Sequence, residues 1–168
     1  MLRVIFDTNI YGHLINEPDA EVLEQKIIQE PEFVVYGFGP IRKEIRNIST
    51  SSRLGRQTRL YLLGLYDRIT KSHTLPESSR VMDLAKEYHG RYQAAGGAYG
   101  WDTNIQIDFI IVACASIHGL DIIYSRDKRT MGNVKAIRAY DAVNQKENVR
   151  TPNLIDYELL VKKFRGLL

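Results

Sequence analysis

Val4-Ile5-Phe6-Asp7-Thr8-Asn9 is the stretch that decides the fold, because it joins a short apolar run to a polar turn at Asp7. The apolar run begins at Leu2. Buried strands of parallel sheets have this pattern: they are brief, almost continuously apolar and bounded by turn residues. Ligands of open parallel sheets bind beyond the carboxyl ends of the strands. Asp7 is therefore predicted to lie at a ligand-binding edge.

Outward from this stretch, predicted strands alternate with predicted helices. Further strands are predicted at 33–36, 69–75, 121–124 and 134–139. Helices are predicted at 9–15, 18–28, 40–48, 53–66, 76–95, 105–118 and 153–167. Strands that alternate with helices imply a parallel sheet with right-handed crossovers. The sequence thus predicts an α/β fold with a central parallel sheet flanked by helices.

Composition limits the number of domains and the kinds of site that the protein can contain. The 168 residues are 44% hydrophobic, which suits a single domain over 1–168. One cysteine, Cys114, excludes an internal disulfide and a cysteine-based zinc site, and we expect it in the core. We see no signal peptide and no apolar run long enough to span a bilayer, so a cytoplasmic protein without a membrane partner is expected.

Acidic residues follow several of the predicted strands. Asp7 and Asp127 come directly after strands, whereas Glu44 and Asp108 occupy first turns of helices. All four can converge at one edge, where burying unpaired carboxylates is costly. A divalent cation relieves this repulsion, and Mg²⁺ and Mn²⁺ prefer hard oxygen ligands. The sequence therefore predicts a Mg²⁺ or Mn²⁺ site able to activate water and neutralise a phosphate.

Each acid also has a purely structural interpretation. Asp7 and Asp127 could cap helices or form turns. Glu44 could pair with neighbouring basic residues, and Asp108 could simply favour the positive end of its helix dipole. Asp102, six residues before Asp108, is better interpreted as a helix cap than as a member of the acidic site.

The acidic positions fall in segments whose order and spacing resemble the PIN-domain nucleases, and VapC-type toxins in particular. The resemblance spans residues 4–127 and rests on Val4–Asn9, Pro40–Ile45, Ile107–Ala115 and Ser125-Arg126-Asp127. The chain departs from the compact toxins in its extra length between 49 and 101. The second acid and the Phe that often follow the Ser-x-Asp motif are also missing.

The resemblance implies a PIN-like three-layer fold and a Mg²⁺- or Mn²⁺-dependent endoribonuclease that leaves 5′-phosphate and 3′-hydroxyl ends. It matches Asp7, Glu44, Asp108 and Asp127 to the family's catalytic, metal-binding quartet. Asn9 and Ser125 match its supporting polar positions. It also implies a homodimer and, for the toxin of a type II toxin–antitoxin pair, an antitoxin partner.

Charge is unevenly distributed along the chain. The stretch 17–32 holds six acidic residues and one basic residue, whereas 42–71 holds eight basic and two acidic residues. A basic stretch can follow an RNA backbone, although it can also be a solvated helix face. The candidate RNA contacts are Arg42, Arg46, Arg53, Arg56 and Arg59. Tyr99 and Trp101 could stack bases, but packing of a loop or a dimer face is the more common role for such residues.

Two other functions are compatible with parts of this pattern. A PIN-like scaffold could grip RNA or a protein partner without catalysis, although an intact acidic quartet disfavours this. A metal-dependent phosphatase often places a second acid two residues after its aspartyl nucleophile. Position 9 is Asn, which disfavours that chemistry.

Overall fold

The computed structural model describes residues 1–49 and 53–167, and within them five parallel strands form one sheet. The order across the sheet is β3-β2-β1-β4-β5, with β1 at its centre. The strands are β1 (Leu2–Phe6), β2 (Phe33–Phe38), β3 (Thr74–Leu75), β4 (Ile122–Tyr124) and β5 (Asn153–Ile155). The predicted α/β class and the parallel sheet are confirmed.

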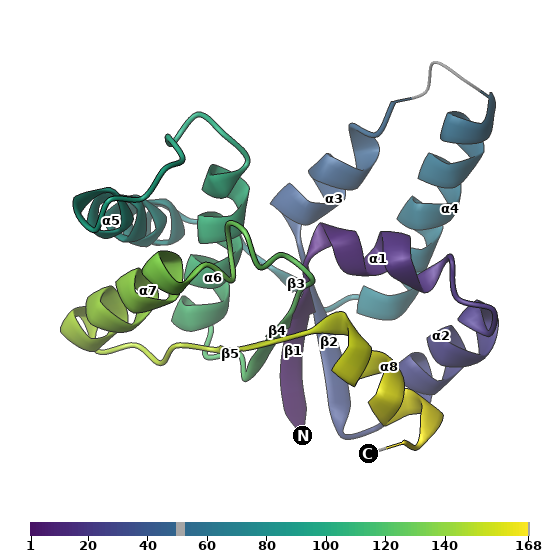
Figure 1. The fold of residues 1–168 in the computed structure, drawn as a ribbon. Helices are drawn as coiled ribbons and strands as arrows, with labels where there is room; N and C mark the ends of the chain where they lie inside the picture. The colour runs from purple at the N-terminus through teal and green to yellow at the C-terminus, as the bar shows by residue number, and fades with distance from the viewer. Residues whose placement is uncertain (50–52, 168) are drawn as a thin grey trace.

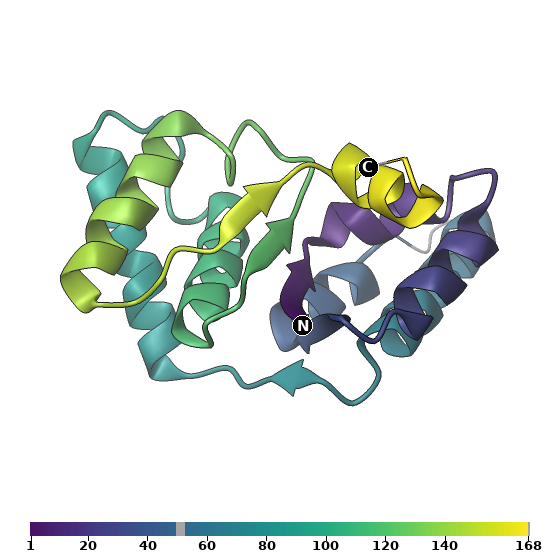
Figure 2. The ribbon, with the colours of Figure 1, turned by 90° about the horizontal axis from the view of Figure 1, so that it is seen from below.

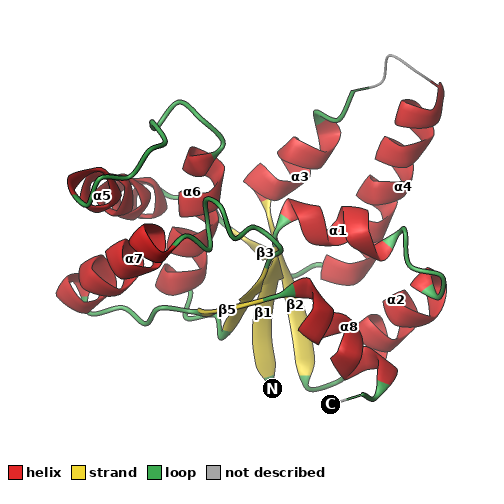
Figure 3. Ribbon diagram, viewed as in Figure 1, coloured by secondary structure: helices red, strands yellow, loops and turns green. Residues whose placement is uncertain are grey.

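Helices cover both faces of the sheet, which gives three layers (Figure 1, Figure 3). One group holds α1 (Thr8–Leu14), α2 (Ala20–Gln29), α3 (Gly39–Arg46), α4 (Arg53–Thr70) and α8 (Tyr157–Arg165). The other holds α5 (Ser79–Ala94), α6 (Ile105–Ile117) and α7 (Val134–Glu147). Seen from below, the segment around β3 carries the chain from the first group to the second (Figure 2).

The core is one apolar cluster that spans the sheet and both helical layers. α6 is its most enclosed helix, because nearly every residue from Asp108 to Ser116 is buried, as expected for a helix that is apolar all round. Cys114 is fully buried within it, which confirms the predicted core position. Among the described residues, no helix is both long and apolar enough to cross a membrane.

The strand register brings the ends of β1, β4 and β5 level with one another. Phe6 pairs with Tyr124, and Tyr124 pairs with Ile155. The pairing continues one residue further, because the Asp7 amide donates to the Tyr124 carbonyl at 3.0 Å. The Ser125 amide donates to the Ile155 carbonyl at 3.1 Å. Asp7 and Ser125 are thus fixed at the carboxyl edge of the sheet.

One predicted element is wrong, and two others are right only in part. The stretch 134–139 is the start of α7, not a strand, because its apolar residues continue at helical spacing through Ala136, Tyr140 and Val143. Helix α8 begins only at Tyr157, because 153–155 pairs with β4 as the edge strand. The predicted strand at 69–75 is right only at its end: residues 69 and 70 finish α4, 71–73 form a turn, and Thr74–Leu75 pair with β2.

Candidate functional site

Asp7 is held by both of its carboxylate oxygens. It is the N-cap of α1, and its Oδ1 accepts a hydrogen bond from the Thr8 amide at 2.7 Å. Its Oδ2 accepts from the Ser125 hydroxyl at 2.7 Å and from the Asn9 amide group. Asn9 Oδ1 in turn accepts from the Arg126 amide at 3.2 Å. Asp7 therefore caps α1 and also lies at the carboxyl edge of the sheet. Asn9 and Ser125, the two predicted supporting residues, orient its side chain.

Thr130 joins Asp108, in the first turn of α6, to Asp127, in the loop after β4. Its single hydroxyl contacts Oδ2 of both carboxyls. Because one hydroxyl carries one hydrogen, both contacts are hydrogen bonds only if one carboxyl is protonated. Asp127 is further held by the amides of Arg129 and Thr130, at 2.7 and 2.9 Å from its Oδ1. Asp127 is thus the better stabilised anion of the two.

Glu44 reaches the same edge from α3. Its Oε2 accepts a hydrogen bond from the hydroxyl of Thr8, the residue after Asp7. Pro40 in the first turn of α3 and the buried Ile41 and Ile45 hold this helix against the core. The half-buried Glu44 is thereby fixed beside Asp7.

Electrostatics show that the four carboxylates interact. Burial raises the pKa of Asp7 to about 6, and the charges of Glu44 and Asp127 add to this effect. Burial raises the pKa of Asp108 to about 8, with further contributions from the other three carboxylates. At neutral pH Asp108 is therefore the protonated carboxyl of the pair, although the hydrogen bond from the Thr130 hydroxyl opposes this effect. Burial also acts on Asp127, but hydrogen bonds from Thr130 and neighbouring amides outweigh it and lower the pKa.

The chemistry of this donor set fits a hard divalent cation. Every acid in it offers carboxylate oxygens, and burial makes their mutual repulsion costly without a counterion. Within the described residues, however, no three acidic, histidine or cysteine side chains are close enough together to hold a metal ion as they stand. Instead, the Thr130 hydroxyl lies between Asp108 and Asp127, and the Thr8 hydroxyl contacts Glu44. Side-chain rotation at these hydroxyls would be needed for shared coordination.

The loop after β4 is packed tightly around Asp127. A Cβ added at Gly132 would lie 2.6 Å from the Asp127 carbonyl oxygen and 3.2 Å from Lys128 Cα, which are both backbone atoms. We therefore expect Gly132→Ala to displace Asp127 and to reduce RNA cleavage, the activity that the sequence resemblance implies, about 100-fold, the usual effect of misplacing a reacting group by about 1 Å. Gly90→Ala in α5 is the matched control, because nothing lies within 4 Å of its added Cβ. Equal activity of the two variants in a cleavage assay would contradict the prediction.

The predicted RNA-binding arginines differ in their surroundings. Arg42 forms a two-pronged ion pair with Asp67, with both nitrogen–oxygen distances at 2.9 Å, so its charge is already compensated. Arg59 donates to the Arg46 carbonyl at 3.4 Å, and Arg56 is exposed in α4. The Arg53 side chain lies outside the described part of the chain. These positions belong to the α3–α4 hairpin, which projects away from the sheet (Figure 1).

Sequence reasoning missed the basic residues on either side of Asp127. Arg126, Lys128 and Arg129 are exposed on the loop that carries this acid. Lys128 forms an ion pair with Asp156 at 2.9 Å but remains 82% exposed. The sequence Ser-Arg-Asp-Lys-Arg-Thr could have predicted this, because basic residues next in sequence to an acid at the sheet edge must lie at the same edge.

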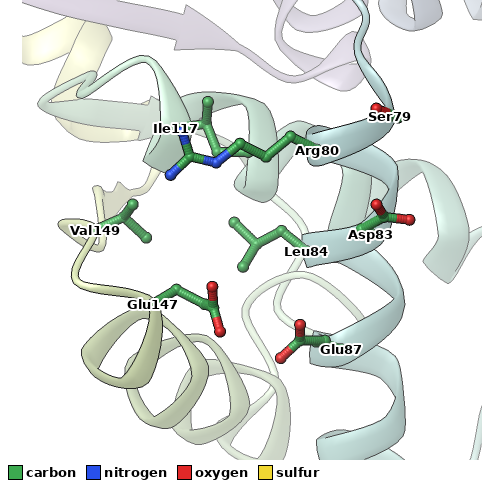
Figure 4. Close-up of a pocket in the computed structure, with 8 residues that line it drawn as sticks. All are labelled: Ser79, Arg80, Asp83, Leu84, Glu87, Ile117, Glu147 and Val149. Carbon is green, nitrogen blue, oxygen red and sulfur yellow. The ribbon is translucent and has the colours of Figure 1, made fainter.

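Two other features lie apart from the acidic edge. Asp102 is exposed in the turn before α6, whereas the charges that raise the pKa of Asp108 come from the other three acids of the quartet. A pocket of about 260 Å³ lies between α5 and the end of α7 and includes Ile117 (Figure 4). Asp108 lies nine residues before Ile117 in α6, about 14 Å along the helix. The pocket is therefore separate from the carboxylates.

The arrangement of strands and helices defines a PIN-like α/β fold. A chain in the crystal structure of VapBC2 from Rickettsia felis bound to a DNA fragment from their promoter has a similar fold. The TM-score is 0.60, and the match covers 92% of this chain and 98% of that chain. Sequence identity is 11%, so this likeness shows the fold alone. No protein-family model and no curated protein matches the sequence.

Proposed function

We propose that this protein is a Mg²⁺- or Mn²⁺-dependent endoribonuclease that hydrolyses RNA phosphodiester bonds. The observation that carries the proposal is the convergence of Asp7, Glu44, Asp108 and Asp127 at one sheet edge. Burial and mutual repulsion there raise the pKa of Asp7 and Asp108. Burying carboxylates that repel one another lowers the stability of the fold, and such clusters with shifted pKa values are typical of functional sites. The PIN-like fold places this edge where parallel sheets bind their ligands.

The chain's own residues have distinct roles in this proposal. The four acids would hold the cation, while Asn9 and Ser125 fix Asp7 and the backbone amides of the β4 loop fix Asp127. A bound Mg²⁺ or Mn²⁺ would supply charge neutralisation at the phosphate and a lowered pKa for the attacking water. Asp108 must lose the proton that it shares with Thr130 before it can act as a ligand.

Basic residues beside the acids would bind the RNA backbone. Arg126 and Arg129 flank Asp127 and are exposed, so they are placed to contact the phosphates next to the bond that is cut. Arg46 and Arg56 would contact phosphates further along the α3–α4 hairpin.

We further propose that the protein acts as the toxin of a toxin–antitoxin pair and forms a homodimer. The support is the sequence resemblance to VapC-type toxins together with the fold shared with a chain of the VapBC2 structure. A short upstream reading frame that encodes a DNA-binding segment would favour this role.

The direct test is incubation of a mixed RNA pool with Mn²⁺ and either the wild-type protein or Asp7→Asn. We expect wild type to cleave and chelation of the metal to stop cleavage. The substituted asparagine keeps an oxygen that can cap α1 but removes the charge, so the variant should stay folded by circular dichroism and be inactive. Cleavage by folded Asp7→Asn at the wild-type rate would overturn the assignment.

One observation favours a second function, a non-catalytic module that binds RNA or a protein. Among the described residues, no three potential ligands are close enough to share a metal, and two threonine hydroxyls satisfy the acids instead. Calorimetry distinguishes the two functions. Heat of Mn²⁺ binding that disappears in Asp108→Asn supports the nuclease, whereas no binding by wild type supports the module.

A further inference from the structure

The loop 96–101 between α5 and α6 is held in one conformation although it contains no strand or helix. The Tyr99 carbonyl accepts a hydrogen bond from the Gln93 side chain at 2.7 Å and lies 3.1 Å from His89 Nε2. The Tyr92 hydroxyl accepts from the amides of Ala98 and Tyr99, at 3.1 and 3.4 Å. These bonds use the backbone of the loop, whereas the half-buried ring of Tyr99 contacts the core and the guanidinium of Arg129.

The loop 96–101 is also packed closely onto α5. A Cβ at Gly97 would lie 2.2 Å from a ring carbon of Tyr92, so only glycine fits there without a shift. Lys135 Nζ at the start of α7 donates to the Gly96 carbonyl at 2.7 Å. A segment anchored in this way presents its side chains with little loss of conformational freedom on binding, which favours a binding surface.

The ring of Tyr99 lies beside the acidic edge. The guanidinium carbon of Arg129 is 5.9 Å from the centre of this ring, and the Arg129 amide donates to Asp127. The loop also leads directly into α6, whose first turn holds Asp108. Figure 1 shows this loop and the loop after β4 at the same end of α6. An aromatic ring, a cation and two carboxylates of the acidic edge are thus neighbours.

Packing accounts for only part of this arrangement. Tyr99 and Trp101 both touch the core, and both remain half-buried, with the Trp101 ring centre 5.4 Å from that of His89. Aromatic rings that are partly exposed beside a cationic, phosphate-binding edge can stack unpaired bases. The exposed cations Arg126 and Arg129 favour a polyanionic partner over an apolar protein surface.

We propose that Tyr99, with Arg129, is a base-stacking site that selects single-stranded RNA next to the bond that is cut. The inference rests on the proposed nuclease function and extends it to the substrate. An unpaired base takes the face of the ring over which Arg129 lies, and the exposed Arg129 side chain moves to the adjoining phosphate. Bases inside a duplex cannot reach the ring, so duplex RNA is disfavoured.

The chain's single tryptophan, Trp101, gives a readout that does not depend on cleavage. The experiment titrates the folded Asp7→Asn protein with a short unpaired oligouridine, and then with a duplex of equal length. It records Trp101 fluorescence and the anisotropy of a labelled oligonucleotide. We expect the single strand to change both signals and to bind at least about 10-fold more tightly than the duplex.

Two variants at Tyr99 separate stacking from packing. Tyr99→Phe keeps the ring, whereas Tyr99→Leu keeps apolar bulk and the backbone bonds but removes the aromatic face. Loss of one stacked base weakens single-strand binding about 10-fold or more, so we expect this for Leu and not for Phe. Equal affinities of the two variants, or no response to any oligonucleotide, would overturn the stacking site.

The proposed function is judged separately, on the wild-type protein. If wild type cleaves RNA and Tyr99→Leu does so with unchanged KM, the stacking site is overturned and the nuclease remains. If the Tyr99-dependent binding is present but wild type cleaves no RNA with Mn²⁺, the stacking site is supported and the nuclease is overturned.

Discussion

Asp108→Asn is expected to lower the rate of Mn²⁺-dependent RNA cleavage about a thousandfold. The substitution removes a buried carboxyl that could ionise to hold a cation, while an amide can still hydrogen-bond to Thr130. Loss of several kcal/mol of charge stabilisation corresponds to this reduction, because each 1.4 kcal/mol is a factor of ten. Single-turnover cleavage of a labelled RNA measures the chemical step directly.

Asp102→Asn is the matched control for this prediction. It makes the same chemical change six residues earlier in the chain, at an exposed position in the turn before α6. We expect its cleavage rate to stay within about twofold of wild type, as is usual for an exposed side chain away from the site. A large loss in Asp102→Asn, or none in Asp108→Asn, would place the site elsewhere.

The same substitution at Asp108 is expected to stabilise the metal-free protein at alkaline pH. The pKa of Asp108 rises from its ordinary 3.8 to about 8 on folding, so the unfolded chain ionises first as pH increases. The stability that protonated Asp108 contributes is complete below about pH 4 and is lost progressively as pH rises towards 8. An asparagine side chain cannot ionise, so the variant keeps this stability. At pH 8.5 these two pKa values correspond to a gain of up to about 5 kcal/mol, or at least about 10 °C in Tm.

Thermal unfolding of both proteins in a chelating buffer, at several pH values, measures this effect. The difference in Tm should be small near pH 4.5 and largest above pH 8. Adding Mn²⁺ at pH 8.5 should then raise the Tm of wild type and leave that of Asp108→Asn nearly unchanged, since a ligand stabilises only the form that binds it. A Tm difference independent of pH would mean that ionisation of Asp108 does not oppose folding.

Much of the fold could be predicted because a few local patterns determine it. The apolar run before Asp7 and the wholly apolar helix after Asp108 can each be recognised within a short window. Together they predict a parallel sheet with acids at its carboxyl edge. The strand predicted at 134–139 is wrong because weak alternation over six residues cannot be told from the start of an amphipathic helix.

The contacts that organise the acids could not be predicted. Thr8 and Thr130 contribute hydroxyls to the site, but threonine at a turn carries no periodic signal and is common in loops. Whether Thr130 reaches Asp108 depends on the register between β1 and β4 and on the tight turn at Gly132. The neighbourhood of Tyr99 and Arg129 likewise depends on how two loops meet in space.

The central position of β1 has a consequence for synthesis of the chain. Among the described strands β1 is made first, and it pairs on one side with β4, which is made more than a hundred residues later, while β5 completes that side of the sheet. The hydrogen bond between Asp7 and Ser125 therefore cannot form until the chain is 118 residues longer. A nascent chain interrupted before β4 lacks both Ser125 and Asp127, so the acidic edge cannot form in it. Contacts this distant in sequence also slow folding, so the acidic edge is among the last parts of the fold to be assembled.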